Sequence, residues 1–133
     1  MRVTARLAYG LGALVDLAAA GRPVKGMALA GRYGVSVGFL ENILAELRRA
    51  GFVQSKRGGQ GGYWLARPAT EITVADVMRA LDGGRVEADA ATHDGLASVW
   101  QTIARATMDA AESFTLASMV GADARTQHET RFN

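Results

Sequence analysis

The sequence contains no cysteine among its 133 residues. Without a thiol, the chain has no disulfide, no cysteine nucleophile, no zinc finger and no iron–sulfur cluster held by thiolates. Histidine is nearly as scarce: His93 and His128 are the two that the sequence holds, too few for a convincing metal site. We therefore expect a protein that carries no cofactor and no metal.

Long apolar runs are missing as well, although hydrophobic residues make up 49% of the sequence. No stretch approaches the roughly 18 apolar residues that a membrane-spanning helix needs. Asp16 interrupts the first amphipathic stretch, which makes that stretch a poor signal peptide. A chain of this length fits one domain with its own hydrophobic core. We expect it in the cytoplasm, without a membrane partner.

The enzyme motifs that the sequence matches either lack a required residue or stand in the wrong structural context. Residues 34–38 fit the G-x-S-x-G pattern of a nucleophile elbow, but that motif follows a buried strand, and a short helix is predicted here. Gly21 and Gly26 have the glycine spacing of a phosphate-binding loop, yet Met27 stands where the lysine belongs. Because no catalytic constellation is left, the sequence predicts a protein that is not an enzyme.

The charges are divided unevenly along the chain. Residues 1–67 hold ten Lys or Arg and three Asp or Glu, a balance of +7, whereas residues 68–133 hold five and ten, a balance of −5. A basic half joined to an acidic half is typical of a polyanion-binding module attached to a part that does not bind polyanions. A scattered, solvated set of charges is the alternative, and charge alone does not decide between the two.

Two helices are predicted at the start of the chain. Thr4 is a suitable N-cap for the first, whose apolar residues recur at helical spacing until Gly21 ends it. The second helix is shorter, covers residues 26–33 and is broken by Gly34. Its expected inward residues are Met27, Leu29 and Ala30.

A third helix and a hairpin follow. Ser36 is the expected N-cap of a helix that Gly51 ends as its C′ residue. Residues 52–56 and 63–66 have the composition of strands, and the four glycines of residues 57–62 suit the tip of a hairpin. Helix, helix, turn, helix and hairpin in this order is the plan of a winged helix-turn-helix.

The second half is predicted to be helical apart from one polar loop. Thr73 caps a fourth helix, residues 85–95 are polar and acidic, and apolar residues recur at helical spacing from Leu96 to about Ser113. The expected fold is mainly α with a small β-hairpin wing. Its predicted parts are a winged helix-turn-helix over residues 1–83, a loop over 84–95, a dimerisation helix over 96–120 and a flexible tail over 121–133.

The start of the third helix is the first candidate for contact with DNA, because that end of a recognition helix enters the major groove. Asn42 can pair with adenine, Glu41 can accept from cytosine, and Phe39 can touch a thymine methyl. Phe39 as a core residue and Ser36 as a simple cap are the structural alternatives.

The hairpin tip is the second candidate. Lys56 and Arg57 beside four glycines form a slim basic projection that suits a narrow minor groove, although an ordinary flexible hairpin has the same composition. The predicted DNA-binding residues are Arg2, Thr4, Ser36, Gly38, Phe39, Glu41, Asn42, Arg49, Lys56, Arg57, Gly58, Gln60, Gly61 and Tyr63.

The long helix is the third candidate, because a projecting helix with large apolar side chains often pairs with a second copy of itself. The predicted dimerisation residues are Leu96, Val99, Trp100, Ile103 and Phe114. A homodimer suits double-stranded DNA that carries a palindromic operator, with half-sites about one helical turn apart.

These stretches resemble the Rrf2 family of bacterial transcriptional regulators. The resemblance spans residues 1–83 closely and 92–120 more loosely. The matching segments include residues 9–17, 34–36 (GVS), 39–41 (FLE), 47–53 (LRRAGFV), 56–63 (KRGGQGGY) and 72–82. The resemblance implies a homodimer held by the long helix, with the first helix of one subunit touching the other. It also implies operator contacts from the recognition helix and from Arg57.

The chain departs from the family where many members bind an iron–sulfur cluster. Those members carry three cysteines in the segment that corresponds to residues 83–92 of this chain, and these residues include no cysteine. Cluster sensing is therefore not implied. The expected function is that of a dimeric, sequence-specific DNA-binding regulator that represses by occupying promoter DNA. Two alternatives stay open: a winged-helix module that binds a partner protein through its long helix, and a regulator gated by a small molecule bound beside that helix.

Overall fold

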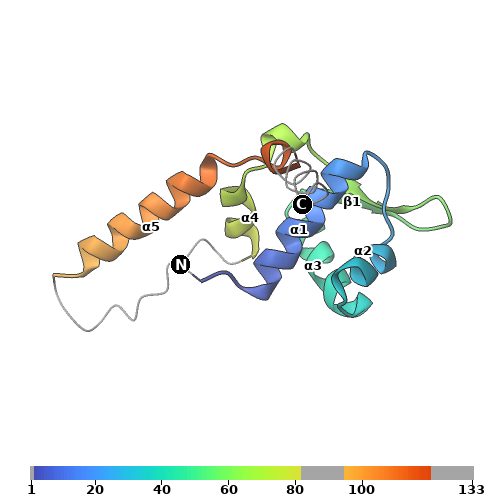
Figure 1. The fold of residues 1–133 in the computed structure, drawn as a ribbon, viewed down its shortest axis with the longest axis horizontal. Helices are drawn as coiled ribbons and strands as arrows, with labels where there is room; N and C mark the ends of the chain where they lie inside the picture. Colours follow the sequence, from blue (N-terminus) through green and yellow to red (C-terminus); the bar gives the residue numbers. More distant parts are fainter. Residues whose placement is uncertain (1, 82–94, 121–133) are drawn as a thin grey trace, which may run out of the picture.

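The computed structural model describes residues 2–81 and 95–120 of the chain. Nearly all of the predicted loop, the whole of the predicted tail and both histidines lie outside the described residues. Within those residues the chain is mostly helical and contains one two-stranded antiparallel sheet (Figure 1). The expected fold class, mainly α with a β-hairpin, is confirmed.

The helices and strands fall within a residue or two of their predicted bounds. In chain order they are α1 (Ala5–Ala20), α2 (Gly26–Tyr33), α3 (Val37–Arg49), β1 (Val53–Lys56), β2 (Gly62–Leu65), the 3-10 turn η1 (Ala69–Glu71), α4 (Val74–Leu81) and α5 (Ala97–Glu112). Residues 116–120 form a further helical turn. Across the described ranges, no helix combines the length and the apolar character that crossing a membrane requires.

Local hydrogen bonds set the ends of these helices. The hydroxyl oxygens of Thr4, Ser36 and Thr73 each accept from the backbone N–H three residues further on, all at 3.1 Å. At the opposite ends of α1 and α2, Gly21 and Gly34 adopt left-handed conformations with φ of 63° and 68°, which glycine reaches without a steric cost. The caps and stops predicted from the sequence are therefore confirmed.

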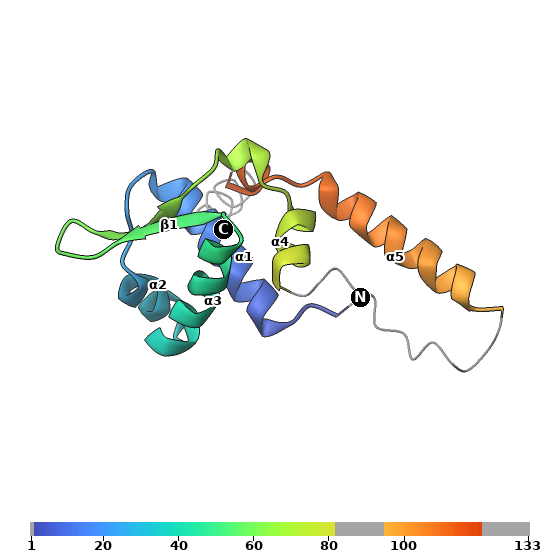
Figure 2. The same ribbon diagram turned by 180° about the vertical axis from the view of Figure 1, so that it is seen from behind.

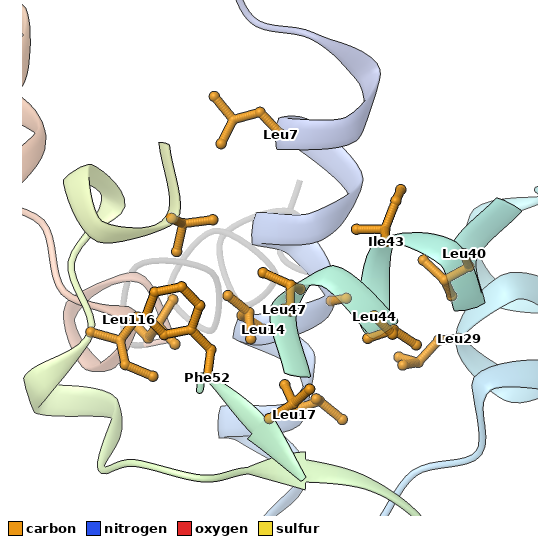
Figure 3. Close-up of a cluster of buried hydrophobic side chains, with 14 of the residues drawn as sticks. Leu7, Leu14, Leu17, Leu29, Leu40, Ile43, Leu44, Leu47, Phe52 and Leu116 are labelled. Atoms are coloured by element: carbon orange, nitrogen blue, oxygen red, sulfur yellow. The ribbon is translucent and has the colours of Figure 1, made fainter. Parts of the chain in front are cut away.

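The core forms where α1 and α3 pack against each other. Leu14 and Leu17 of α1 point toward Leu44 and Leu47 of α3, and Phe52 closes the cluster beyond them (Figure 3). These side chains are at most 5% exposed. Packing both helices on one apolar cluster fixes the face that α3 turns to solvent.

Met27 lies outside this core, which contradicts its predicted inward position. Its side chain is 72% exposed, whereas Leu29 and Ala30 of the same helix are 3% and 1% exposed. Because α2 has only eight residues, its apolar periodicity covers about two turns. A pattern that short does not distinguish a residue on the buried stripe from one beside it.

The hairpin and α5 extend from opposite ends of the molecule, as both ribbon views show (Figures 1 and 2). The C-terminal end of α5 is anchored to the start of α4. The N–H of Val74 donates to the carbonyl of Phe114, and the N–H of Leu116 donates to the carbonyl of Ile72, both at 2.9 Å. An ion pair between Arg79 and Glu112 adds to this anchor.

Replacing Leu44 with alanine is expected to lower the free energy of unfolding by about 2–5 kcal/mol, because this fully buried side chain would leave a cavity. Met27→Ala is the matched control and is expected to change that free energy by no more than about 0.5 kcal/mol. Urea unfolding followed by circular dichroism measures both. Equal losses for the two variants would contradict this account of the core.

Candidate nucleic-acid interface

A tight turn separates α2 from α3. The N–H of Gly34 donates to the carbonyl of Gly31 at 3.4 Å, and the N–H of Val35 donates to the carbonyl of Ala30 at 3.1 Å. These bonds close α2 after Tyr33, and the Ser36 cap opens α3 at Val37. The short connection holds α3 across α2 in the arrangement of a helix-turn-helix.

The first turn of α3 is open to solvent. Ser36 and Gly38 are exposed, and an added Cβ at Gly38 would meet no atom within 4 Å. Phe39 is 37% exposed, while its ring makes an edge-on contact with Tyr9 at a centroid distance of 5.7 Å. One part of the Phe39 side chain therefore packs inward against Tyr9, and another part is accessible to solvent.

Other polar side chains of α3 are engaged within the chain. The Asn42 carbonyl oxygen accepts from Arg6 Nη1 at 3.4 Å, and Arg6 also forms an ion pair with Glu46. This contact uses one of the two lone pairs of the amide oxygen, so Asn42 keeps acceptor capacity and both of its N–H donors for an adenine edge. The sequence reasoning missed Arg6, because a contact across 36 residues leaves no local signal.

Arg48 and Glu41 link α3 to the hairpin. Arg48 Nη1 donates to Ser55 Oγ of β1 at 3.0 Å. The Glu41 carboxylate lies against Gly26, where an added Cβ would come within 3.3 Å of Oε1 and 3.4 Å of the Tyr63 ring. Burial raises the pKa of the Tyr63 hydroxyl, the Glu41 charge raises it further, and Arg48 opposes the shift. The Tyr63 side chain of β2 is half-buried and lies close enough to Glu41 and Arg48 of α3 to sense both charges.

The hairpin tip presents its cations to solvent. Lys56 and Arg57 are exposed, and so is Gln60. Gly61 closes the turn by donating its N–H to the carbonyl of Gly58 at 3.0 Å. An added Cβ at Gly61 would lie 2.0 Å from the Lys56 carbonyl oxygen, so only glycine fits there. Gly61 is therefore required by the geometry of the turn. The sequence analysis assigned it to close approach to DNA and did not separate these two roles.

A third extended segment runs along the hairpin. Val24 and Tyr63 exchange two backbone hydrogen bonds of 2.9 and 2.8 Å, and the Lys25 ammonium donates to the carbonyl of Gly58 at the tip. Gly62 makes the close approach possible, because its φ is 139° and an added Cβ would lie 2.7 Å from the Val24 oxygen. The sequence predicted none of this, since one bridging residue is too short to produce an alternating pattern.

Three predicted residues lie apart from the hairpin tip. Thr4 acts as the N-cap of α1, and Arg49 is exposed in the last turn of α3. Arg2 is also exposed, and Figures 1 and 2 both show the start of the chain well away from the hairpin. The structure therefore joins α3 to the strands of the hairpin through Glu41 and Arg48, but it does not bring Arg2 to the tip.

Comparison with known proteins points to one family. The Rrf2 family, described as iron-dependent transcriptional regulators, matches residues 3–122. The chain is 39% identical over 132 residues to a protein of Mycobacterium tuberculosis that is provisionally named an HTH-type transcriptional regulator. That match covers 91% of this chain and 82% of the relative.

Solved structures agree with this match. The chain resembles IscR of T. potens with a TM-score of 0.81 and 36% identity, covering 96% of this chain and 91% of that one. It resembles CymR, the global cysteine regulator of B. subtilis, with a TM-score of 0.80 and 28% identity, covering 92% and 98% of the two chains.

The iron dependence in the family's description does not fit the residues of this chain. An iron–sulfur cluster is held by cysteine thiolates, and the sequence has none. In the part of the chain that the structure describes, no three His, Asp or Glu side chains gather as metal ligands. The segment that holds the cysteines in relatives lies outside the described residues.

Gly62→Ala is expected to lower the free energy of unfolding by about 1–3 kcal/mol, because it places a side chain at a positive φ and against Val24. Gly59→Ala is the control: no atom lies within 4 Å of its Cβ position and its φ is not in the left-handed range. Urea unfolding and hydrogen exchange of the Tyr63 amide measure the two effects. Similar behaviour of both variants would rule out the paired Val24 segment.

Proposed function

Since the chain belongs to the Rrf2 family of DNA-binding transcriptional regulators, and so is a regulator and not an enzyme, we propose that it is a homodimeric repressor that occupies a palindromic operator. In this proposal α3 and the hairpin contact DNA, and α5 holds the two protomers together. The observation that carries it is the uncovered apolar side of α5.

The α5 helix makes few contacts with its own chain. Its sixteen residues form a rod about 24 Å long, and Ala111 is the one buried residue among them. Val99, Trp100 and Ile103 are 45%, 40% and 41% exposed and share one side of the helix at the i, i+1, i+4 spacing. An isolated helix of this length is marginal in water, so a partner that covers this side supplies the missing burial.

The outer surface of α1 offers a place for that partner. Ala8, Leu11, Gly12 and Val15 line a groove of about 400 Å³ together with Met119. Small residues at Ala8 and Gly12 allow a second helix to approach closely. Asp16, Arg32 and Tyr33 supply polar groups to the same groove. A reciprocal arrangement, in which each α5 packs on its partner's α5 and beside its partner's α1, would cover the apolar side of α5 and the apolar part of this groove.

The opposite placement of α5 and the hairpin supports two-fold operator recognition. A symmetry axis through a pair of α5 helices would set the two copies of α3 and the hairpin at the outer ends of the dimer (Figure 1). Dimers of this kind read half-sites separated by one helical turn of DNA or multiples of it. A dimer seated on a promoter in the cytoplasm blocks polymerase by occupancy, and a small-molecule or protein effector would adjust that occupancy.

Arg57→Ala is expected to weaken operator binding several-fold and to reduce the slope of log affinity against log salt by about one unit, because one phosphate contact is lost. Operator fragments are first selected from random duplex DNA. Binding is then measured at several salt concentrations. Arg105→Ala, which removes an exposed charge on α5, is the control and should leave both quantities unchanged. An unaltered slope for Arg57→Ala would remove the hairpin tip from the interface.

Ile103→Glu is expected to convert the dimer into monomers, because it places a charge in the apolar contact between protomers. Gln101→Glu introduces the same side chain on the opposite side of α5, about 160° around the helix from Ile103 at 100° per residue, and should stay dimeric. Sedimentation equilibrium measures both masses. A dimeric Ile103→Glu variant, or a monomeric parent, would contradict the proposed role of α5.

A further inference from the structure

A pocket of about 560 Å³ lies behind the hairpin, where the end of α1 meets both strands. Val53 of β1 is 2% exposed and faces the core, so Gln54 and Lys56 point to the opposite side of the strand. Trp64 pairs with Gln54 across the ladder and shares that outer side. The residues that line the pocket come from the end of α1, the hairpin and the segments beside them, and none comes from α3 or α5. The pocket is therefore at a different place from the site expected beside the long helix.

The lining combines an apolar floor with a cationic rim. The floor includes half-buried Trp64 and buried Leu17, with prolines on either side. Arg22, Lys56 and Arg67 supply three positive charges, Gln60 adds an amide, and no acidic residue lines the pocket. Ligand sites are commonly of this volume, mostly apolar, with a few polar groups that fix orientation. The complementary ligand is flat, apolar and anionic.

One rim cation is held in place by the protein. The Arg67 guanidinium donates to the carbonyl of Glu71 at 3.0 Å and lies over the Phe52 ring at 5.8 Å from its centroid. Arg22 and Lys56 are exposed at the other edges. A carboxylate can therefore meet a fixed guanidinium on one side and adjustable cations on the other.

The residues that line the pocket belong both to the hairpin and to the segment that leads into its pairing with Val24. Lys56 and Gln60 belong to the hairpin, and Arg22 and Pro23 directly precede the segment that pairs with it. That segment continues into Val24, which bonds to Tyr63, and Lys25, which bonds to the tip at Gly58. A ligand in the pocket would contact both partners of this pairing and bias the position of the tip.

We propose that this pocket binds a small aromatic carboxylate and that its occupancy changes the affinity of the hairpin for DNA. The binding step is independent of the proposed function, whereas the effect on DNA rests on it. Trp64 stacks on the aromatic ring of the ligand, and Arg22, Lys56 and Arg67 neutralise the carboxylate.

The test uses 2-naphthoate as the probe and 2-naphthylmethanol as its uncharged counterpart. Two-dimensional NMR of the full chain resolves the indole N–H signals of Trp64 and Trp100, and Trp100 on α5 serves as the internal control. We expect naphthoate to shift the Trp64 signal in a saturable manner, with at least tenfold tighter binding than the alcohol, and to leave Trp100 unmoved. Arg22→Gln should weaken naphthoate binding three- to tenfold, whereas Arg49→Gln, outside the pocket, should not. Trp64→Leu, followed through the backbone N–H signals of Lys56 and Gln60 in the pocket lining, should weaken it at least tenfold.

Several outcomes would overturn the proposal. An unmoved Trp64 signal at millimolar naphthoate, equal binding of the alcohol, or equal shifts of both indoles would each show that no anion site exists. The cations could instead meet DNA phosphates: a reduced salt slope for ligand-free Arg22→Gln on selected operator fragments would show this and also overturn the proposal. If no operator is enriched from random DNA, the proposed function fails. The naphthoate titration still tests whether the pocket binds an aromatic carboxylate.

The effect on DNA is then measured with the parent protein. Saturating naphthoate is expected to change operator affinity at least threefold, and Trp64→Leu should abolish that response while still binding the operator. An operator affinity that saturating naphthoate leaves unchanged would overturn the regulatory half of the proposal.

Discussion

The packing of α1 against α3 is the contact on which the rest of the structure depends. Leucines at positions 14 and 17 meet leucines at 44 and 47, all nearly or fully buried (Figure 3). Because these side chains occupy one side of α3, its opposite side faces solvent along the whole helix. The polar and basic residues of α3 acquire their orientation first from this apolar contact, and contacts such as Arg48 to Ser55 and Arg6 to Glu46 add to it.

The hairpin depends on a second constraint, which is the close approach of its backbone at Gly61 and Gly62 to the backbone of Lys56 and Val24. Gly61 and Gly62 occupy positions where a Cβ would collide with the backbone of Lys56 or Val24. The two glycines allow a tight turn and a third paired segment, and that segment holds the tip at a defined distance from α2. A hairpin rich in glycine is usually taken as flexible, yet here two of its glycines permit the contacts that restrain it.

The local features were predictable because they depend on neighbours in the sequence. Thr4, Ser36 and Thr73 cap helices through hydrogen bonds that reach three residues along the chain, and Gly34 ends α2 through its own backbone conformation. Apolar spacing located α3 and α5 to within one or two residues. Met27 was misplaced because α2 is too short for its periodicity to define a buried side, so neighbouring elements decided its exposure instead.

The sequence by itself determined the order of the elements, their caps and the hairpin, and the missing cysteines excluded a thiolate-held cluster. Only the tertiary structure decided that Val24 borders the hairpin, that Arg6 reaches Asn42 and that a cation-rimmed pocket lies behind Trp64. It also decided that, among the described residues, the apolar side of α5 stays exposed. The physical reason is range: capping and periodicity act within a few residues. The contacts of Arg6 with Asn42 and of Val24 with Tyr63 join residues 36 and 39 positions apart, and the pocket and the exposed side of α5 depend on which surfaces the packed core leaves free.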